Sequence, residues 1–365
     1  MKRTAMGIIL GDTAWERLPG LTDNRTTASI PFGGRYRLID FTLSNMAHAG
    51  VTRVGVLSCR HYRSLMDHVG NGKEWDLSRK HGGLFVLPPF SGKNNGMYHG
   101  TAEALVGITD FVTAGNEDLC IIAESDMVSS VDLTEAIRAH EDAQNDITVV
   151  YAQTKLTSPH RVYDLSGGSV TAVREGKAGE TGTVAVAYLY NRQRLVNILR
   201  EAEDHGFKDF ELDLVVNQQT HAKIGAVEAK GCLLLIDSLQ AYYDANKRLL
   251  LPAVRDALFV PSRPVYTSAS IRMPAKFGQN GSVKNSLIAA GCEIEGEVTD
   301  CILFRGVHIG KGARVHHCVI LNDAFIGDHA HVSHAVVDRA ARVEPEHSVC
   351  GTADELFYLA QSAVI

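Results

Sequence analysis

The sequence lacks the features that would place it in a membrane or outside the cell. No apolar run is long enough to cross a bilayer, because a charged residue or a glycine soon interrupts each one, and the start, MKRTAMGIIL, does not resemble a signal peptide. The seven cysteines are odd in number and include no C-x-x-C pair, which is typical of scattered reduced thiols. We therefore expect a cytoplasmic protein with no membrane segment.

An excess of basic charge is also missing. Lys and Arg number 36 against 42 Asp and Glu, which gives a net charge of -6, whereas a general nucleic-acid binder needs clustered Lys and Arg. Charged residues at 21% and hydrophobic residues at 45% describe a globular chain. At 365 residues the chain is long for one ordinary core, so we expect two domains.

Short apolar runs alternate with amphipathic stretches in the first part of the chain, which predicts a mostly parallel sheet flanked by helices. The expected strands are residues 6–10, 53–58, 119–124, 147–153 and 183–191. The expected helices are residues 40–49, 101–114, 133–143 and 237–259. Pro252 lies inside the last of these, so a kink or two helices should result.

A second pattern begins after residues 260–284, a stretch with three prolines and two glycines that we interpret as a linker. Aliphatic residues then recur every six positions, and each set of three recurs 17 residues later. Regular six-residue spacing of this kind predicts a parallel β-helix of stacked three-sided coils. An antiparallel sheet would instead show two-residue alternation and hairpin turns. The three sets are Leu303, Ile309 and Val315; Ile320, Ile326 and Val332; and Val337, Val343 and Val349.

Both ends of this repeat are less regular. Residues 287–301 fit an earlier, imperfect coil, and residues 353–365 predict a short amphipathic helix that caps the last one. Histidines are frequent in the repeat, and the 17-residue period places His317 and His334 at the same position of successive coils. We expect a solvated or interface-facing ladder, the alternatives being a metal site or the catalytic histidine of a hexapeptide acyltransferase.

Several segments resemble one known family. PFGGRYRLIDFTLSN at residues 31–45, followed by AGVTRVGVL at 49–57, closely resembles the glucose-1-phosphate adenylyltransferase (ADP-glucose pyrophosphorylase) family. YHGTAEAL at 98–105, ESDMV at 124–128 and IDSLQAYYDAN at 236–246 are similar to further family segments in the same order. The resemblance implies a Rossmann-like nucleotidyltransferase domain with a mixed, mostly parallel sheet, followed by a left-handed parallel β-helix.

We place the expected boundaries accordingly. The α/β domain would span residues 1–259, the linker residues 260–284, and the β-helix with its helical tail residues 285–365. The implied reaction joins glucose 1-phosphate to ATP, giving ADP-glucose and pyrophosphate in glycogen biosynthesis. Such chemistry needs Mg²⁺ and cations to neutralise the charge that develops at phosphorus.

The resemblance also implies site residues. The family holds Mg²⁺ with two aspartates, which correspond to Asp126 and Asp237. Either could instead be a helix N-cap, since Asp is a favoured cap, and Asp237 directly precedes an expected helix. Arg17 corresponds to the catalytic arginine, although it could merely pair with nearby acids. The implied nucleotide-binding positions are Gly11, Trp15, Gly100, Thr101 and Glu103.

Departures from the family pattern converge on the phosphate-binding groups. Trp15 falls on a loop glycine, where an indole would occupy the space of the triphosphate, and Asp12 and Glu16 would repel it. Three family side chains are replaced and one glycine is lost: Thr27 stands for a phosphate-binding lysine, Cys59 for an adenine-binding glutamine, Gly176 for the lysine of the sugar-phosphate segment, and Glu211 for the glycine of Asp-Phe-Gly.

These changes together resemble the GlgD type of subunit, a poorly active partner of a catalytic ADP-glucose pyrophosphorylase subunit. The alternative is a competent adenylyltransferase with an atypical nucleotide loop, in which Trp15 stacks on the base. Arg25 and Arg37 match family positions that bind anionic effectors such as phosphorylated sugars, although both could be surface arginines paired with acids. Family precedent implies a homo- or hetero-tetramer that uses ATP and glucose 1-phosphate.

Overall fold

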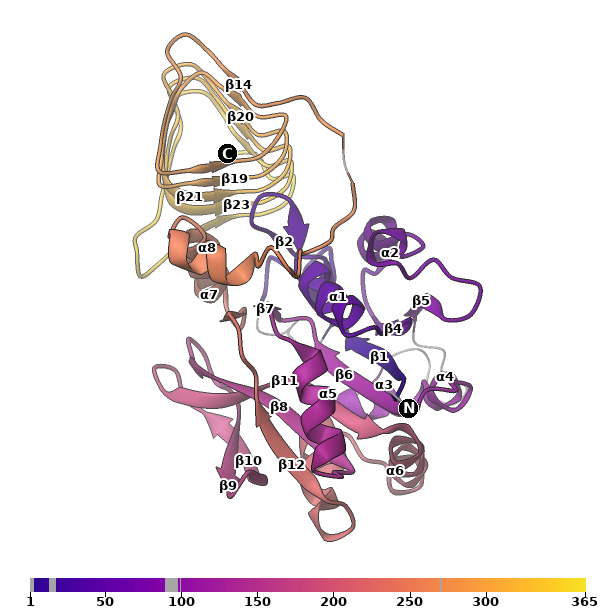
Figure 1. Ribbon diagram of the computed structural model, residues 1–365. Coiled ribbons are helices and arrows are strands. Elements are labelled where there is room, and N and C mark those ends of the chain that lie inside the picture. Colours follow the sequence, from indigo (N-terminus) through magenta and orange to yellow (C-terminus); the bar gives the residue numbers. More distant parts are fainter. Residues whose placement is uncertain (1–2, 13–17, 89–97, 99, 270) are drawn as a thin grey trace.

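The computed structural model describes residues 3–12, 18–88, 98, 100–269 and 271–365 (Figure 1). Its main sheet has seven strands in the order β12-β8-β11-β6-β1-β4-β5. Strand β11 is antiparallel to both of its neighbours, and the other four pairs are parallel, which confirms a mixed, mostly parallel sheet. The strands are β1 (Ala5–Leu10), β4 (Arg53–Leu57), β5 (Gly83–Leu87), β6 (Leu119–Glu124), β8 (Ile147–Lys155), β11 (Thr181–Asn191) and β12 (Ile224–Glu228).

Helices cover this sheet and link it to the second domain. Residues 101–114, expected as one helix, form two, because the backbone of Ile108 leaves the helical region between them. Residues 237–259 also form two helices, as Pro252 predicted, and this proline begins the second. The helices are α1 (Leu38–His48), α2 (Arg63–Val69), α3 (Thr101–Val106), α4 (Thr109–Thr113), α5 (Leu133–Asp142), α6 (Arg192–His205), α7 (Leu239–Arg248) and α8 (Pro252–Leu258).

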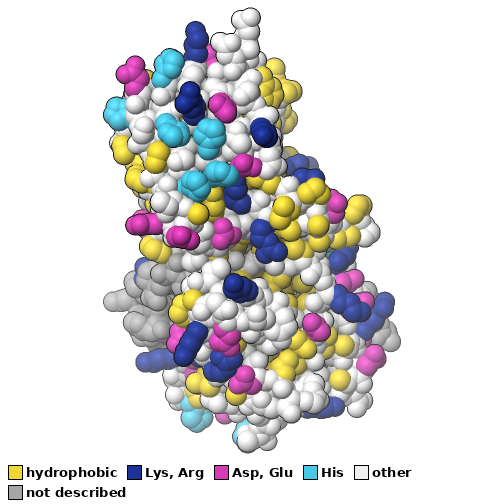
Figure 2. Space-filling model, turned by 90° about the vertical axis from the view of Figure 1, so that its left-hand side faces the viewer, with side chains coloured by type: hydrophobic (Ala, Val, Ile, Leu, Met, Phe, Trp, Pro, Cys, Tyr) yellow, Lys and Arg dark blue, Asp and Glu magenta, His cyan; other side chains and the backbone are white. Residues whose placement is uncertain are grey.

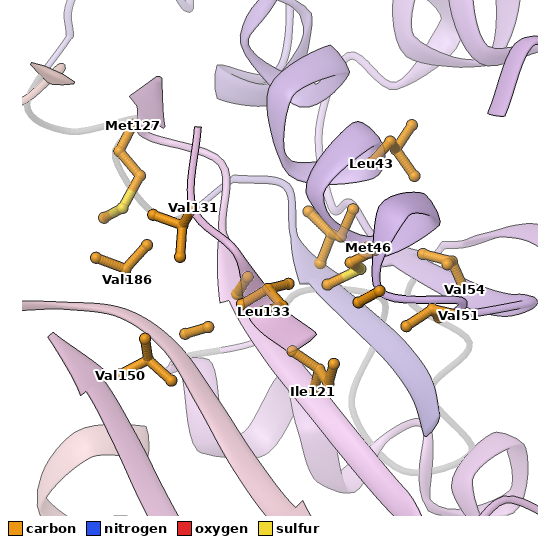
Figure 3. Packing of buried hydrophobic residues seen from close by; sticks show 14 of the residues in the cluster. Leu43, Met46, Val51, Val54, Ile121, Met127, Val131, Leu133, Val150 and Val186 are labelled. Carbon is orange, nitrogen blue, oxygen red and sulfur yellow. The ribbon is translucent and has the colours of Figure 1, made fainter. Parts of the chain in front are cut away.

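Two hydrophobic layers hold the sheet between the helices. Successive residues of a strand point to opposite faces, so Ile121 of β6 belongs to one layer and Ile122 to the other. Figure 3 shows the first layer, where Leu43 and Met46 of α1 pack toward Val54 of β4. Because both faces are buried, the five inner strands read as nearly continuous apolar runs, and the sequence predicted them. It missed the edge strands β5 and β12, whose residues are partly exposed.

Shorter elements surround the carboxyl end of the sheet. Two antiparallel pairs lie there, β7 (Met127–Ser129) with β13 (Leu233–Leu235), and β9 (His160–Ser166) with β10 (Ser169–Gly176). The remaining elements of this domain are β2 (Pro31–Phe32), β3 (Tyr36–Arg37), the 3₁₀-helices η1 (Thr27–Ser29), η2 (Lys73–Trp75) and η4 (Val216–Thr220), and the π-helix η3 (Phe210–Val215).

The second domain is a parallel β-helix, and the 17-residue period is its coil length. Leu303 pairs with Ile320, and Ile320 with Val337, while all nine aliphatic residues of the repeat are buried. The strands are β14 (Lys276–Phe277), β15 (Ser282–Lys284), β16 (Leu287–Ile288), β17 (Glu293–Ile294), β18 (Glu297–Thr299), β19 (Ile302–Leu303), β20 (His308–Ile309), β21 (Arg314–Ile320), β22 (Phe325–Ile326), β23 (His331–Val337), β24 (Arg342–Val343), β25 (Ser348–Cys350) and β26 (Phe357–Leu359).

Both ends of the β-helix differ in detail from the expected pattern. The helix expected at residues 353–365 is wrong, since β26 pairs with β23. The last coil presents backbone N–H groups that need acceptors, and the tail supplies them: Asp338 N donates to Leu359 O and Arg342 N to Ala363 O. At the other end, β14 and β15 lie within the stretch expected as a linker and already pair with β17 and β18.

The α/β domain meets the β-helix through α7, α8 and the residues around β2, as Figure 1 shows. Tyr242 of α7 and Leu249, which follows this helix, share one buried cluster with Phe41 of α1 and Phe304 of the β-helix. The Tyr243 hydroxyl donates to His317 O at 2.7 Å. Among the described residues, no helix has the length and apolar character needed to cross a membrane.

Candidate functional site

The described part of the nucleotide loop is its entrance, Gly11 and Asp12. A Cβ on Gly11 would lie 2.5 Å from Leu57 O, so β4 approaches too closely for any other residue. Trp15 and Arg17 fall in residues 13–17, which lie outside the described residues. Their assignments as nucleotide-binding and catalytic positions stay predictions.

The Asp12 carboxylate is engaged by the segment that follows β4. Its Oδ2 accepts hydrogen bonds from Cys59 N at 2.6 Å, Ser58 Oγ at 3.0 Å and Arg60 N at 3.2 Å. Burial raises the pKa of Asp12 despite these bonds. Burial, aided by the Asp12 charge, also raises the pKa of the Cys59 thiol to about 11. The sequence predicted that Asp12 would repel the triphosphate. In the structure its carboxylate links the end of β1 to the segment that follows β4.

Thr27 is packed against the loop entrance without contributing a charge. It begins η1, whose Ala28 N donates to Gly11 O at 3.0 Å. The Thr27 side chain is fully buried, and its hydroxyl has no hydrogen-bond partner among the described residues. The position that resembles a phosphate-binding lysine thus offers only a neutral hydroxyl beside the loop.

Gly100, Thr101 and Glu103 lie at the start of α3, where the helix docks on the segment before η3. A Cβ on Gly100 would lie 2.2 Å from Lys208 O, and Thr101 Oγ1 accepts a hydrogen bond from Phe210 N at 3.2 Å. Glu103 stands in the first turn of the helix. Packing alone accounts for the small residues here, and their nucleotide contacts stay predictions.

The structure brings Asp126 and Asp237 together. Strands β7 and β13 pair directly beside them, and Ile236 N donates to Asp126 O at 2.8 Å. Both side chains are buried, at 0% and 1% exposed. Neither is a helix N-cap, because Ser238 caps α7 and Asp132 caps α5. The cap interpretation of these two aspartates is therefore wrong.

The Asp237 carboxylate already has protein donors on both oxygens. Thr157 Oγ1 donates to Oδ1, and Ser158 N donates to Oδ2 at 3.2 Å. No group of three or more His, Cys, Asp or Glu side chains suited to a metal occurs in the part of the chain that the structure describes. Mg²⁺ is commonly held by one or two carboxylates together with substrate phosphates, so this pair fits such a site only with a nucleotide present.

A pocket of about 430 Å³ opens where β6 ends and β9 begins, and its lining is strongly acidic. Arg161 is the one Lys or Arg among its described lining residues, and it is already paired: its Nη2 lies 2.5 Å from Asp209 Oδ2 and its Nε 3.9 Å from Glu211 Oε2. The lining residues are Thr101, Glu124, Pro159, His160, Arg161, Glu175, Ala185, Tyr188, Asp209 and Glu211.

Glu211 is fixed in the wall of this pocket. Its Oε1 accepts hydrogen bonds from the Tyr188 hydroxyl at 2.7 Å and the Tyr163 hydroxyl at 2.8 Å. The side chain is only 15% exposed, and burial raises the pKa of Glu211. The residue that replaces a family glycine therefore fills space in the pocket with a carboxyl group.

The expected lysine of the sugar-phosphate segment has no room at its position. Gly176 is buried at the end of β10, and a Cβ there would lie 2.6 Å from Leu156 Cδ1 and 2.9 Å from Val162 Cγ1. Its neighbour Glu175 lines the pocket, whereas the exposed Lys177 is not among the lining residues.

Sequence reasoning did not single out Arg161, Tyr163 or Tyr188. The pocket collects side chains from α3, β6, β9, β10, β11 and the start of η3, and no local spacing links these elements. The one sequence feature that pointed to this pocket was Glu211 in place of a family glycine. Its hydrogen-bond and ion-pair partners could not be identified before the fold was known.

Arg25 and Arg37 lie where the two domains meet. Arg25 is only 6% exposed and pairs with Asp338 of the β-helix, with Nη2 2.8 Å from Oδ1. Arg37 Nη1 donates to Ser64 Oγ at 2.8 Å, and burial lowers the pKa of Arg37 to about 10. Arg25 is therefore not a surface arginine, and the effector role of both residues stays a prediction.

Histidine side chains gather over the β-helix on the face shown in Figure 2. The rings of His317 and His334 stack with centroids 4.9 Å apart, which confirms that successive coils place them in line. His317 also lies 3.9 Å from Asp300 Oδ2. The ladder is part of the partly exposed coil surface.

Comparison with known proteins agrees with this architecture. Residues 6–247 match the nucleotidyl transferase family, and residues 272–356 match the GlmU-like, C-terminal hexapeptide family. The fold and site thus define a nucleotidyltransferase domain joined to a hexapeptide β-helix.

Individual relatives narrow the class. The chain is 33% identical to glycogen biosynthesis protein GlgD of Bacillus subtilis over 98% of this chain and 96% of the relative. It is 32% identical to GlgD of Geobacillus stearothermophilus over 86% of this chain and 84% of the relative. It is 31% identical to glucose-1-phosphate adenylyltransferase of Thermotoga neapolitana over 85% of this chain and 76% of the relative. The chain belongs to the family of glucose-1-phosphate adenylyltransferases and GlgD proteins.

Proposed function

We propose that this chain is a GlgD-type subunit of glucose-1-phosphate adenylyltransferase in glycogen biosynthesis, with little or no activity alone. Its role would be to modulate a catalytic partner subunit within a homo- or hetero-tetramer in the cytoplasm. The full-length similarity to GlgD of Bacillus subtilis supports the assignment. We keep 1–259 as the α/β domain in this proposal, whereas β14 and β15 start the β-helix within the expected linker 260–284 and before its expected limits 285–365.

The acidic pocket carries the proposal. Adenylyl transfer brings a sugar phosphate and a triphosphate together, and Mg²⁺ with positioned cations must offset their charge. Here the described pocket wall holds Glu124, Glu175, Asp209 and Glu211, and Arg161 is paired with the last two. A pocket with this charge distribution repels glucose 1-phosphate, because no described cation in its wall is left without an acidic partner.

The loop entrance supports the same conclusion. Thr27 supplies no positive charge beside Gly11, and the neighbouring Asp12 supplies none either, since its carboxylate accepts the Cys59 N–H. Each missing cation costs several kcal/mol of transition-state stabilisation in phosphoryl transfer, roughly 3 kcal/mol for one donor in comparable sites. Loss at two or more positions lowers the rate by several orders of magnitude.

Mg²⁺ belongs to the proposal only together with bound nucleotide. Asp126 and Asp237 would hold the ion, which would neutralise phosphate charge. Thr157 and Ser158 hold Asp237 in place for this, although their hydrogen bonds also compete with the ion for its oxygens. Likewise, an effector anion at Arg25 and Arg37 would have to displace the Asp338 carboxylate from Arg25.

A second candidate function is a competent enzyme with an atypical loop. The observation that favours it is the preserved Asp126–Asp237 pair, which is buried, adjacent and not used for helix capping. A working metal site would keep this arrangement, whereas a site without chemistry has no need of two buried aspartates on neighbouring backbone segments.

The experiment measures pyrophosphate release from ATP and glucose 1-phosphate with the protein alone, with a catalytic subunit alone, and with both. We expect no robust rate from the protein alone and a changed rate or effector response in the mixture. A robust rate alone would overturn the regulatory assignment. No rate alone and no effect on the partner would overturn both candidates.

The Asp126→Asn variant separates the two roles within the mixture. If this chain only modulates its partner, the variant leaves the mixture's rate unchanged. If the chain contributes its own turnover, the rate falls by the share that this chain supplied. Glu135→Asn, an exposed residue of α5 that pairs with Lys230, is the control for non-specific effects.

A further inference from the structure

The segment that leads out of the nucleotide loop packs against the C-terminal tail. We call residues 18–25 the exit segment. Gly20 has φ +81°, and a Cβ there would lie 2.5 Å from Cε1 of Tyr358, so the tyrosine ring rests on the backbone of this turn. Leu18 and Leu21 belong to the same buried cluster that Leu356 and Tyr358 pack against.

A buried ion pair fastens the same two segments. Arg25 Nη2 donates to Asp338 Oδ1 and to Gln361 Oε1, both at 2.8 Å. Asp338 is fully buried and its other oxygen, Oδ2, accepts the Tyr358 hydroxyl at 2.6 Å. One carboxylate of the last coil thus holds both the arginine of the exit segment and the tyrosine that covers it.

This arrangement tolerates little displacement. Removing one partner of a buried pair leaves the other charge without compensation, which costs far more than the pair contributes. The ring of Tyr358 lies so close to the Gly20 backbone that a side chain at this position would collide with it. The buried ion pair and this close contact together fasten the exit segment to the tail.

The exit segment connects in turn to the entrance of the loop. It runs directly into Thr26 and η1, where Ala28 N donates to Gly11 O. A shift of the exit segment therefore reaches both chain segments that flank residues 13–17. The tail itself is part of the coil edge, because Asp338 N donates to Leu359 O.

We propose that Arg25, Asp338, Tyr358 and Gln361 form a clamp through which the last coil of the β-helix controls the exit segment of the nucleotide loop. A contact that moves the last coil opens or tightens the clamp, and binding at the loop acts back on the coil by the same free energy. The clamp is a property of this chain's own fold, and it holds whether or not the chain catalyses adenylyl transfer.

Hydrogen exchange measured by mass spectrometry on the full chain tests the clamp. Asp338→Asn and Tyr358→Phe should raise exchange at least tenfold in residues 18–25, where Thr22 N is bonded to Leu18 O, and leave β6 and the coil containing Ile326 unchanged. Asp354→Asn makes the same charge change at an exposed position outside the clamp and should change nothing. Unchanged exchange in residues 18–25, or an equal rise throughout the chain, would overturn the proposal.

A reciprocal variant separates coupling from local damage. Thr22→Val removes the hydrogen bond from Thr22 Oγ1 to Leu18 O, which lies wholly within the exit segment, and it should raise exchange in residues 357–361. If the effect of Thr22→Val stops at the exit segment, the clamp does not couple the two sides. Should Asp338→Asn fail to fold, Tyr358→Phe decides the first test, because it keeps the ring on Gly20 and removes only the hydroxyl bond.

Discussion

Replacing Glu211 by Gln should make the acidic pocket accept an anion. The variant keeps the shape of the side chain, and its amide oxygen can still accept from the hydroxyls of Tyr163 and Tyr188. It removes one negative charge from a wall in which Arg161 is already shared between Asp209 and Glu211. The variant also releases Arg161 from one of its two acidic partners.

The pocket size sets the magnitude. A cavity of about 430 Å³ has a radius of roughly 5 Å, and two unit charges about 5 Å apart repel by about 3 kcal/mol at an effective dielectric constant of about 20. Water in the open pocket and the charge of Arg161 reduce this to about 1–2 kcal/mol. The dissociation constant for glucose 1-phosphate should therefore fall by about tenfold.

Calorimetric titration with glucose 1-phosphate at low salt measures this change. Glu201→Gln on the exposed face of α6 removes the same charge away from the pocket and should leave binding unaltered. The difference between Glu211→Gln and the native protein should shrink as salt is added. Tight binding by the native protein, with no gain in Glu211→Gln, would refute the electrostatic argument.

The same variant has a pH signature in stability. Burial raises the pKa of Glu211 above its ordinary value of 4.5 in the folded chain, so over that interval the folded state binds more protons than the unfolded state. Stability contributed by this group is therefore present below pH 4.5 and falls as the pH rises toward the raised value. Denaturation midpoints measured across this range should fall with pH in the native protein and show a smaller fall in Glu211→Gln.

Three further outcomes follow from burial and hydrogen bonding. Thr27→Val should leave the free energy of unfolding unchanged or raise it by less than about 1 kcal/mol, because the buried hydroxyl has no described partner to lose; a larger loss in a denaturant titration would contradict this. Ile326→Ala, at a fully buried position in the middle coil, should cost about 2–5 kcal/mol in the same titration, whereas a loss under 1 kcal/mol would argue against tight coil stacking. Among the seven free cysteines, exposed Cys350 should react first with a thiol reagent at pH 8, and the partly buried Cys59 slowly because its pKa is raised to about 11; mass spectrometry of the labelled peptides checks the order.

The repeat was readable from the sequence because it depends on a local rule. Each coil places its inward aliphatic residues at a fixed interval, so Ile309, Ile326 and Val343 had to stack once the coil length was 17 residues. The same kind of reasoning gave a wrong prediction for the C-terminal tail. Residues 353–365 show a helical pattern, but the unpaired edge of the last coil recruits them as a strand.

In the candidate site, too, some features were predicted from the sequence and others became visible only in the structure. Asp126 and Asp237 could be identified by resemblance, yet only the pairing of β7 with β13 showed that they are adjacent and do not cap helices. Asp12 illustrates the opposite case, since a charge expected to repel phosphate proved to bind the backbone of Cys59.

By itself, the sequence determined five strands of the main sheet, the coil length and the family, because these depend on periodicity and on short motifs, but it missed β5, β12 and the helix α6. Tertiary structure alone decided which charges meet. Arg25 and Asp338 are separated by 313 positions, and the pocket around Glu211 draws on six separate elements, α3, β6, β9, β10, β11 and η3. Such contacts depend on how distant segments fold together in space, so the acidity of the pocket and the clamp on the exit segment became visible only in the folded chain.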